Sequence, residues 1–334
     1  MNENKLVFSG VQPTGNLHLG NYLGALKNFV LLQNDTESIY CVVDLHAITL
    51  FQEPKLLRNN ILETTAGFIA SGLDPEKSII FNQSSVSGHA ELAWIFNCIS
   101  RIGWLNRMTQ FKDKAGKDKE KAGVGLYIYP NLMAADILLY KATHVPVGAD
   151  QKQHLELTRD IAQKFNNDFN CEGFFPLPDP LIQKNISRVM SLRNGKNKMS
   201  KSEESDYSRI NLKDSAENIV KKIKKAKTDS APIPDNEKEL NNRPEALNLL
   251  NIYSYLTKKS LSKILSEMSG KDFSFLKSKL TEILISEICP IGKKINQLMS
   301  DKSYLEQILK KGTNKAHIKA EENLKKVRDI VGLI

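Results

Sequence analysis

Two lysines and two serine hydroxyls stand close together in the segment Lys198–Ser202, which reads KMSKS. Ammonium groups and hydroxyls are the donors with which a loop can close over a polyphosphate. Lysine-rich segments are more often solvated surface, so this segment alone leaves both interpretations open. A second segment near the N-terminus bears on the choice.

The second segment is a tight turn between an apolar run and a periodic one. Residues 5–9 predict a short strand, residues 10–15 a turn, and the apolar spacing over 19–30 predicts a helix. The first free N–H groups of a helix favour an anion, and glycines such as Gly15 and Gly20 let a ligand approach the backbone. The order strand, turn, helix therefore suits phosphate binding.

His18 and Asn21 lie three residues apart at the start of this predicted helix. They share one side of the first turn, so both side chains could reach the same phosphate or ribose. The alternative is that His18 caps the helix or packs in the core and that Gln12–Gly15 is an ordinary turn. Neither segment settles the function alone.

The elements that must position these residues alternate between strand and helix. Ile39–Val43 and Ser78–Phe81 are apolar and rich in β-branched residues, as buried parallel strands are, while Pro54–Ala70 and His154–Phe165 are helical in pattern. This alternation predicts an α/β fold: a doubly wound parallel, Rossmann-like sheet with its ligand at the carboxyl ends of the strands.

After Ser202 the strand-like runs give way to amphipathic, Lys- and Leu-rich segments, which predict a C-terminal α-helical domain. The helical segments cover roughly residues 214–227, 245–266, 273–288 and 291–331. Two polar segments, 112–125 and 228–244, predict mobile loops.

Charge is uneven along the 334 residues, a length that suits two domains. Residues 211–334 hold 24 Lys and Arg against 16 Asp and Glu, so they carry +8 of the total +9. Such a region attracts phosphate backbones, more weakly as salt rises. A solvated helix face explains the same lysines, so basicity alone supports RNA binding only modestly.

The cysteines and the apolar runs exclude several classes of protein. Four scattered cysteines form no CxxC pair and have no histidine at metal spacing, so we expect no zinc site, no disulfide framework and a reducing, cytoplasmic location. The motifs begin too early for a cleaved targeting segment, and no run approaches the roughly 18 apolar residues of a membrane span.

Together the two motifs are far more specific than either alone. His18-Leu19-Gly20-Asn21, with Lys198–Ser202 about 180 residues later, resembles the HIGH and KMSKS signatures of class I aminoacyl-tRNA synthetases. Leu19 replaces the usual Ile, and Asn21 replaces the second His, a change common in the tryptophan and tyrosine branch.

Further segments, in the order of that family, resemble tryptophanyl-tRNA synthetases of bacterial type. The resemblance runs from about residue 6 to 260, with Ala149 where many members have Glu. The segments are Phe8–Gly15, Asp44–Thr49, Arg107–Lys112, Leu132–Leu138, Val145–His154 and Arg188–Leu192.

The resemblance implies a two-step reaction. The carboxylate of L-tryptophan attacks the α-phosphorus of ATP, giving tryptophanyl adenylate and pyrophosphate, and the acyl group then passes to the 3′ end of tRNA(Trp). Neither step needs a protein nucleophile, so catalysis is mostly positioning and stabilisation of negative charge. Mg²⁺ is expected to arrive with ATP as substrate, with no tightly bound cofactor and no metal site of the protein's own; a homodimer is implied.

The resemblance also assigns the ATP site. The catalytic residues would be His18, Lys114, Lys198 and Lys201. ATP would lie against Gln12, Pro13, Thr14, Gly20, Asn21, Gly148, Ala149, Asp150 and Val189, and under the loop of Lys198, Met199, Ser200, Lys201 and Ser202.

One carboxylate is the sharpest candidate for reading the amino acid. Met133, Asp136 and Tyr140 share a face of one predicted helix. A carboxylate in so apolar a segment needs a partner, and indole offers a single N–H donor that a carboxylate accepts. A surface or capping aspartate is the alternative.

The remaining tryptophan contacts follow from the resemblance. Phe8, Gly10, His46, Met133, Val145 and Val147 would surround the ring, and Tyr129 and Gln151 would hold the ammonium group. Plain core packing explains the apolar ones equally well. A buried hydrogen bond is worth about 1 to 3 kcal/mol, so Asp136 could exclude phenylalanine without an editing domain.

The expected organisation is a Rossmann-like catalytic domain over residues 1–190, with an inserted segment at about 82–140, and a loop and linker over 191–210. An anticodon-binding helical domain (211–300) and a helix packing back on the catalytic domain (301–334) follow. Three rivals remain: a tyrosyl-tRNA synthetase, a small-molecule nucleotidyltransferase of the same superfamily, and a non-catalytic RNA-binding protein.

Overall fold

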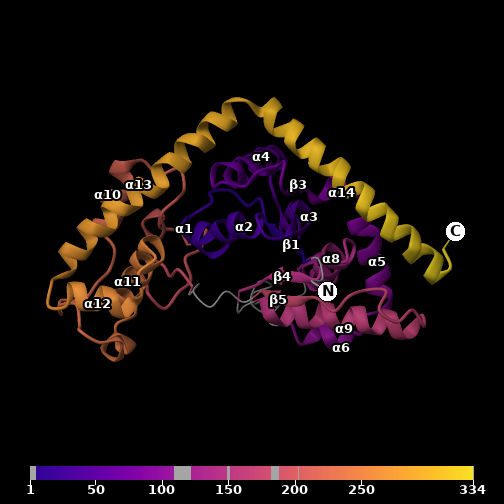
Figure 1. Ribbon diagram of the computed structural model, residues 1–334, viewed down its shortest axis with the longest axis horizontal. Helices are drawn as coiled ribbons and strands as arrows, with labels where there is room; N and C mark the ends of the chain where they lie inside the picture. Colours follow the sequence, from indigo (N-terminus) through magenta and orange to yellow (C-terminus); the bar gives the residue numbers. More distant parts are fainter. Residues whose placement is uncertain (1–4, 109–121, 149–150, 182–187, 202, 334) are drawn as a thin grey trace.

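Figure 1 shows the computed structural model, which describes residues 5–108, 122–148, 151–181, 188–201 and 203–333. Its centre is a five-stranded, fully parallel sheet with the strand order β3-β2-β1-β4-β5. The order reverses between β1 and β4, which opens a crevice at their carboxyl ends. The strands are β1 (Leu6–Val11), β2 (Glu37–Val42), β3 (Ile79–Asn82), β4 (His144–Pro146) and β5 (Asp179–Leu181).

Helices cover both faces of the sheet because its central strands are apolar on both sides. On β2, Tyr40 and Val42 join one buried cluster, and Ile39 and Cys41 join the other. The first cluster includes α2 (Lys27–Leu32) and α4 (Pro54–Ala70); the second includes α8 (Val124–Leu138) and α9 (Lys152–Asp168). The predicted doubly wound parallel sheet with a C-terminal helical domain is confirmed.

The helix predicted over residues 19–30 contains a π-helical turn. It begins as α1 (Leu19–Asn21), widens over Tyr22–Leu26 and continues as α2. The wider turn keeps Tyr22 buried, and burial together with the neighbouring Glu287 of the helical domain raises the pKa of Tyr22 to about 12. Periodicity alone did not reveal this turn.

Besides α4, the described residues between β2 and β4 form α3 (Asp44–Ala47), α5 (Gly88–Ile99), α6 (Ile102–Asn106) and α8. The predicted loop 112–125 lies outside the described residues up to 121, and its last residues, Val124 and Gly125, begin α8 instead.

The helical domain departs from prediction in three places, two of them within residues 228–266. Residues 245–266, expected as one helix, form α11 (Pro244–Thr257) and α12 (Leu261–Met268), because Lys258 adopts the left-handed conformation. The predicted loop 228–244 contains a 3₁₀ helix over Glu237–Asn242, and Ile233 and Leu240 are buried in the core.

The predicted helical segments 273–288 and 291–331 meet at a different place from the one predicted. α13 (Phe273–Ser300) runs through Pro290 and ends before Asp301, where α14 (Lys302–Val331) begins. Leu284, Ile288, Ile291 and Ile295 are buried on both sides of the proline, so packing holds the helix together despite the missing N–H donor. α10 (Ala216–Lys224) and α11 lie against α13.

α13 and α14 form an arch over the parallel sheet and its helices (Figure 1). α14 packs against β3, α4 and α5. Its approach to the edge strand is so close that a Cβ on Gly312 would lie 1.7 Å from the carbonyl oxygen of Ile80. Only glycine, which has no Cβ atom, therefore fits at this crossing.

We predict that Gly312→Ala destabilises the protein by about 1 to 3 kcal/mol, because the added methyl group must push α14 off the backbone of β3. Urea denaturation measures the change. Gly103→Ala is the control, since Gly103 lies in α6 with open space around its Cβ position. Equal stability of the two variants would contradict the prediction.

Candidate functional site

The two motifs meet at the crevice between β1 and β4. The turn Gln12–Gly15 follows β1, and the Lys201 ammonium donates a hydrogen bond to the Thr14 hydroxyl at 3.3 Å. Gly15 has a φ of +80°, a backbone conformation that is strained for residues with a side chain. Segments 187 residues apart are thus brought together at the position where parallel α/β sheets bind ligands.

His18 lies beside this contact as a buried, neutral imidazole. Burial is the main cause that lowers the pKa of His18, to about 3, and the charges of Lys201, Arg209 and Lys198 lower it further. Nδ1 makes no hydrogen bond within the described part of the chain. The His18 backbone N–H donates to the Asn21 side chain at 3.1 Å.

The KMSKS segment begins as the second strand of a hairpin. Met199 N–H donates to Val189 O at 3.0 Å, and Met190 pairs with Lys198 in an antiparallel β-bridge. Met199 is buried and lies next to Gly20 of the first motif. Burial lowers the pKa of Lys201 to about 8, so this ammonium group remains charged at pH 7.

Sequence reasoning missed a third cation behind the loop. Arg209 is buried, and its Nη1 donates to the carbonyl of Glu203 at 2.8 Å and to that of Ser200 at 3.4 Å. It therefore braces the backbone on both sides of position 202. Its place seven residues beyond the motif gave no sequence signal.

Several predicted residues cannot be placed. Lys114, Ala149, Asp150 and Ser202 lie outside the described residues. Gly148 follows β4 and its carbonyl accepts from Gln151 N–H at 3.0 Å. Pro13 is buried in the turn after β1. These described residues stand at the same edge of the sheet as the two motifs.

Asp136 sits in α8 as a fully buried carboxylate with three donors around it. His46 Nε2 lies 2.7 Å from Oδ2, while Gln83 Nε2 and His89 Nδ1 each lie 2.6 Å from Oδ1. The side chains of His89 and Gln83 are fully buried as well. The donors come from α3, from the turn after β3 and from α5.

The network keeps Asp136 ionised. Burial alone would raise the pKa of Asp136, but the two imidazoles outweigh it and hold that pKa below its usual value. An ionised carboxylate only accepts, so we assign hydrogens to His46 Nε2 and His89 Nδ1, and the Tyr140 hydroxyl donates to His89 Nε2 at 2.8 Å. A carboxylate offers about four acceptor positions, which leaves one on Oδ2 for a ligand N–H.

Most of the predicted ring-binding residues belong to, or pack on, the buried apolar cluster that includes Tyr140. Phe8 stacks on Tyr140 with ring centroids 5.7 Å apart. Val145 is buried in the same cluster, and Met133 and Val147 pack on it while partly exposed. Gly10 pairs with Cys41 in the sheet. Their arrangement fits either a pocket wall or the adjoining core.

Tyr129 and Gln151 lie near the start of α9. The Tyr129 hydroxyl is 2.7 Å from His154 Nε2, and burial raises the pKa of Tyr129. Its ring meets that of His46 edge-on, with centroids 6.0 Å apart. Gln151 is the residue that precedes α9. A path of contacts thus joins Asp136 to the α9 end.

Gln83 and His89 were not predicted. Gln83 accepts from Leu45 N–H at 3.1 Å while donating to Asp136, so it joins α3 to α8. Its position directly after a predicted parallel strand was a usable signal, because ligands gather at strand carboxyl ends. His89, within a helix, offered no comparable signal.

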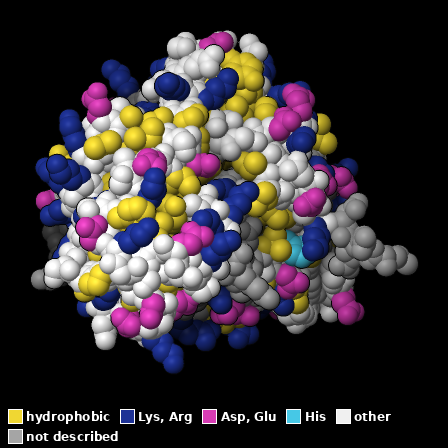
Figure 2. Space-filling model, turned by 60° about the vertical axis from the view of Figure 1, so that its left-hand side comes forward, with side chains coloured by type: hydrophobic (Ala, Val, Ile, Leu, Met, Phe, Trp, Pro, Cys, Tyr) yellow, Lys and Arg dark blue, Asp and Glu magenta, His cyan; other side chains and the backbone are white. Residues whose placement is uncertain are grey.

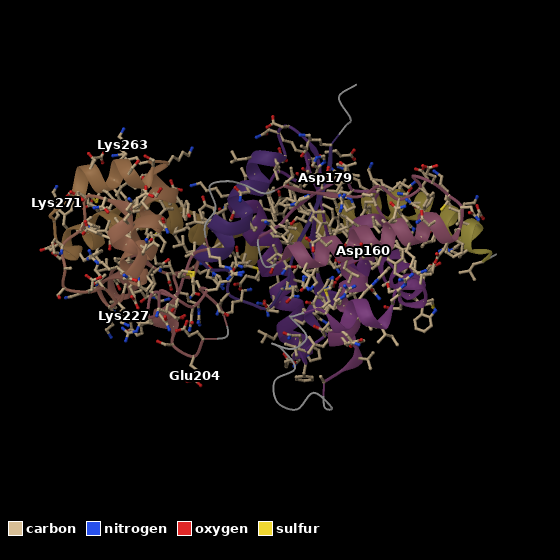
Figure 3. The ribbon with its side chains drawn as sticks, turned by 90° about the horizontal axis from the view of Figure 1, so that it is seen from below. Asp160, Asp179, Glu204, Lys227, Lys263 and Lys271 are labelled. Carbon is tan, nitrogen blue, oxygen red and sulfur yellow. The ribbon has the colours of Figure 1, made fainter. Side chains whose placement is uncertain are left out.

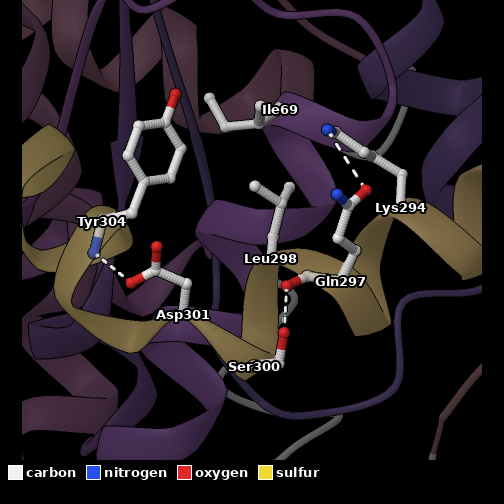
Figure 4. Close-up of a pocket in the computed structure, with 7 residues that line it drawn as sticks. All are labelled: Ile69, Lys294, Gln297, Leu298, Ser300, Asp301 and Tyr304. Carbon is white, nitrogen blue, oxygen red and sulfur yellow. Dashed lines mark hydrogen bonds between the residues drawn. The ribbon is translucent and has the colours of Figure 1, made fainter.

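A separate hollow of about 410 Å³ lies at the elbow between α13 and α14 (Figure 4). Its polar groups largely bond one another: Ser300 donates to Gln297 O, and Tyr304 N–H donates to Asp301. It is lined by Ile69, Lys294, Gln297, Leu298, Ser300, Asp301 and Tyr304. We assign it no ligand.

In the described ranges, no group of three or more His, Cys, Asp or Glu side chains is placed to hold a metal ion. Among the helices that the structure describes, none has the length and apolarity to cross a membrane.

The sheet order and the meeting of the two motifs at its switch point define a class I tRNA synthetase. Residues 1–286 match the family model "tRNA synthetases class I (W and Y)". The chain is 57% identical to the tryptophan–tRNA ligase of Caulobacter vibrioides, covering 98% of this chain and 95% of the relative, and 54% identical to that of Mesorhizobium japonicum, covering 98% of each.

Solved structures agree. The tryptophanyl-tRNA synthetase of Mycoplasma pneumoniae superposes with a TM-score of 0.89 at 35% identity, covering 99% of both chains. That of Campylobacter jejuni, complexed with ADP and tryptophan, gives 0.80 at 34% identity, covering 98% of this chain and 100% of the other. The chain belongs to the tryptophan–tRNA ligases.

We predict that Asp136→Ala raises the KM for tryptophan roughly 5- to 150-fold, the equivalent of about 1 to 3 kcal/mol, while the KM for ATP changes little. ATP–pyrophosphate exchange at varied tryptophan measures this. The control is Asp160→Ala, an exposed position on α9 (Figure 3), and thermal unfolding checks both variants. An unchanged KM for tryptophan removes Asp136 from the site.

Proposed function

We propose that this tryptophan–tRNA ligase activates L-tryptophan in the crevice between β1 and β4, and that the residues described above bind the substrates there. The observation that carries the proposal is the contact between Lys201 and Thr14, which brings the two motifs together at the sheet edge where the Asp136 network also lies. One site can then hold a polyphosphate and an indole side by side.

In the first step, the tryptophan carboxylate attacks the α-phosphorus of ATP, and the bond to the leaving pyrophosphate breaks. Negative charge grows on that leaving group. Lys201 and Lys198 supply positive charge, and His18 lies beside them as a buried, neutral imidazole. A bound polyphosphate also relieves the repulsion among these cations.

Mg²⁺ enters this proposal with ATP. Its chemistry would be to bridge phosphate oxygens and to neutralise part of their charge. We assign it no protein ligands.

Asp136 reads the indole through its remaining acceptor position on Oδ2, next to the His46 imidazole, and the apolar side chains of Phe8 and Met133 would pack on the ring. The substrate of the second step, tRNA(Trp), would reach the adenylate from the helical domain, which carries most of the net positive charge. Lys227, Lys263 and Lys271 project from its periphery (Figure 3).

Figure 2 turns the helical domain toward the viewer. On the face that it shows, lysine and arginine are spread with acidic residues between them. Such a distribution suits contacts with a phosphate backbone at several points, which position RNA without reading its sequence. We assign the anticodon-binding role to residues 211–300 as a whole, and the catalytic role to residues 1–190. The four cysteines are free thiols, which suits a reducing compartment, and we place the protein in the cytoplasm.

We also propose a homodimer formed through an apolar face near α6 and the start of α8. Phe51 is 89% exposed, and Ile102 and Val124 are each 71% exposed. The segments that carry them are in contact: the Tyr127 hydroxyl of α8 donates to Ile102 O at 3.3 Å, and the Gly125 Cβ position is 3.9 Å from the Thr49 methyl group. A second copy is the natural occupant, since the resemblance implies a dimer.

ATP–pyrophosphate exchange tests the proposal. We expect exchange that depends on tryptophan and not on tyrosine, and a loss of about 10²- to 10³-fold in Lys201→Ala with tryptophan affinity nearly kept, because a preorganised cation at the leaving group is removed. Lys196→Ala, an exposed lysine of the same hairpin, is the charge-matched control.

Exchange with tyrosine instead would favour the tyrosyl rival. No exchange with any amino acid would favour a non-catalytic RNA-binding protein. A full rate in Lys201→Ala would return the KMSKS segment to the surface-loop interpretation.

For the dimer, we expect Phe51→Lys to be monomeric in sedimentation velocity at concentrations where the wild type is dimeric, because the interface would have to bury an unpaired charge. Ile318→Lys, at a 70% exposed position on α14, should leave the dimer intact. A Phe51→Lys protein that sediments as the wild type does would place the interface elsewhere.

A further inference from the structure

The hairpin that leads into the KMSKS segment is held by a side chain of the helical domain. Met190 N–H donates to Asn248 Oδ1 at 2.9 Å, and Asn248 Nδ2 donates back to Met190 O at 2.9 Å. A longer contact of 3.4 Å runs from Nδ2 to Ser191 O. Asn248 belongs to α11 and is only 3% exposed.

This pair of hydrogen bonds fixes both position and orientation. One amide matches the donor and the acceptor of a single residue, as a neighbouring strand would. Asparagine is a poor residue for a helix interior, because its side chain competes with the backbone for hydrogen bonds. In α11 the amide is directed outward, to the hairpin.

Other contacts of the hairpin also lead to the helical part of the chain. Lys227 N–H donates to Leu192 O at 2.8 Å, and Arg193 donates to Lys225 O at 2.9 Å. At the hairpin turn, a Cβ on Gly195 would lie 2.4 Å from the Pro244 backbone, where α11 begins. The hairpin is therefore seated on α11 and on the residues that follow α10.

On the opposite side, the KMSKS segment reaches the first motif through the contact of Lys201 with Thr14. Met190, to which Asn248 is hydrogen-bonded, is also the antiparallel β-bridge partner of Lys198 in the motif. Contacts thus lead from α11 to the proposed phosphate site through Asn248, then Met190, then Lys198.

We propose that Asn248 is a positioning residue for adenylate formation: it ties the KMSKS hairpin to α11, so that the helical domain sets where Lys198 and Lys201 stand over the phosphates. The assignment rests on the proposed function of those lysines. The helical domain then takes part in the first reaction step, before any RNA is bound.

The test is the rate of adenylate formation by stopped-flow in Asn248→Ala and in Asn248→Asp. The aspartate is isosteric and keeps the acceptor for Met190 N–H, but it cannot donate to Met190 O. We expect both variants to lose about tenfold or more in rate with tryptophan binding unchanged, since a displacement near 1 Å can cost on the order of 10²-fold. Asn251→Ala, on the same helix, is the matched control.

A double-mutant cycle with Lys201→Ala separates positioning from general damage. If Asn248 acts through the motif lysines, Asn248→Ala should cost far less in the Lys201→Ala background than in the wild type. An equal loss in both backgrounds, an unchanged rate in the single variants, or a failure of both to fold overturns the proposal. Absence of exchange in the wild type, or a full rate in Lys201→Ala, would instead count against the proposed function.

Discussion

The burial of one carboxylate organises the amino-acid side of this protein. Asp136 in α8 is almost fully buried, and an ionised carboxylate there is tolerable only if donors surround it. The donors come from three separate elements: His46 from α3, Gln83 from the turn after β3, and His89 from α5. Satisfying Asp136 therefore fixes these elements relative to α8, and the pocket geometry follows.

The phosphate side of the proposed site gathers positive charge. Beyond burial, the charges of Lys201, Arg209 and Lys198 lower the pKa of His18, and Arg209 is itself paired with Asp206 at 3.2 Å. A polyphosphate bound there would interact favourably with these cations. The two halves of the proposed site are complementary: one would present an acceptor to an N–H group, and the other would present donors to anionic oxygens.

The sequence allowed correct predictions for features that a short segment specifies by itself. It did not reveal residues whose role depends on contacts with distant parts of the chain. Local signals mark β1, β2, β3, the turn after β1 and the KMSKS segment, and so the fold class and the reaction could be predicted. The short strands β4 and β5 were not predicted. Asn248 could not be chosen from many similar amides, because its role depends on Met190, 58 residues away. Gln83 does follow a predicted strand, but its role depends on Asp136, 53 residues away. At Pro290, packing of Ile288 and Ile291 outweighed the local preference for a break.

The close crossing of Gly312 over Ile80 has a consequence for biosynthesis. β3 is an edge strand of the sheet, and α14 is the element that lies against it. Since α14 follows all five strands in the chain, the ribosome makes the sheet before it makes this cover. Until residues 302–331 emerge, the nascent chain carries an uncovered strand edge, which is a template for unwanted pairing. A chaperone would be of most use during that interval.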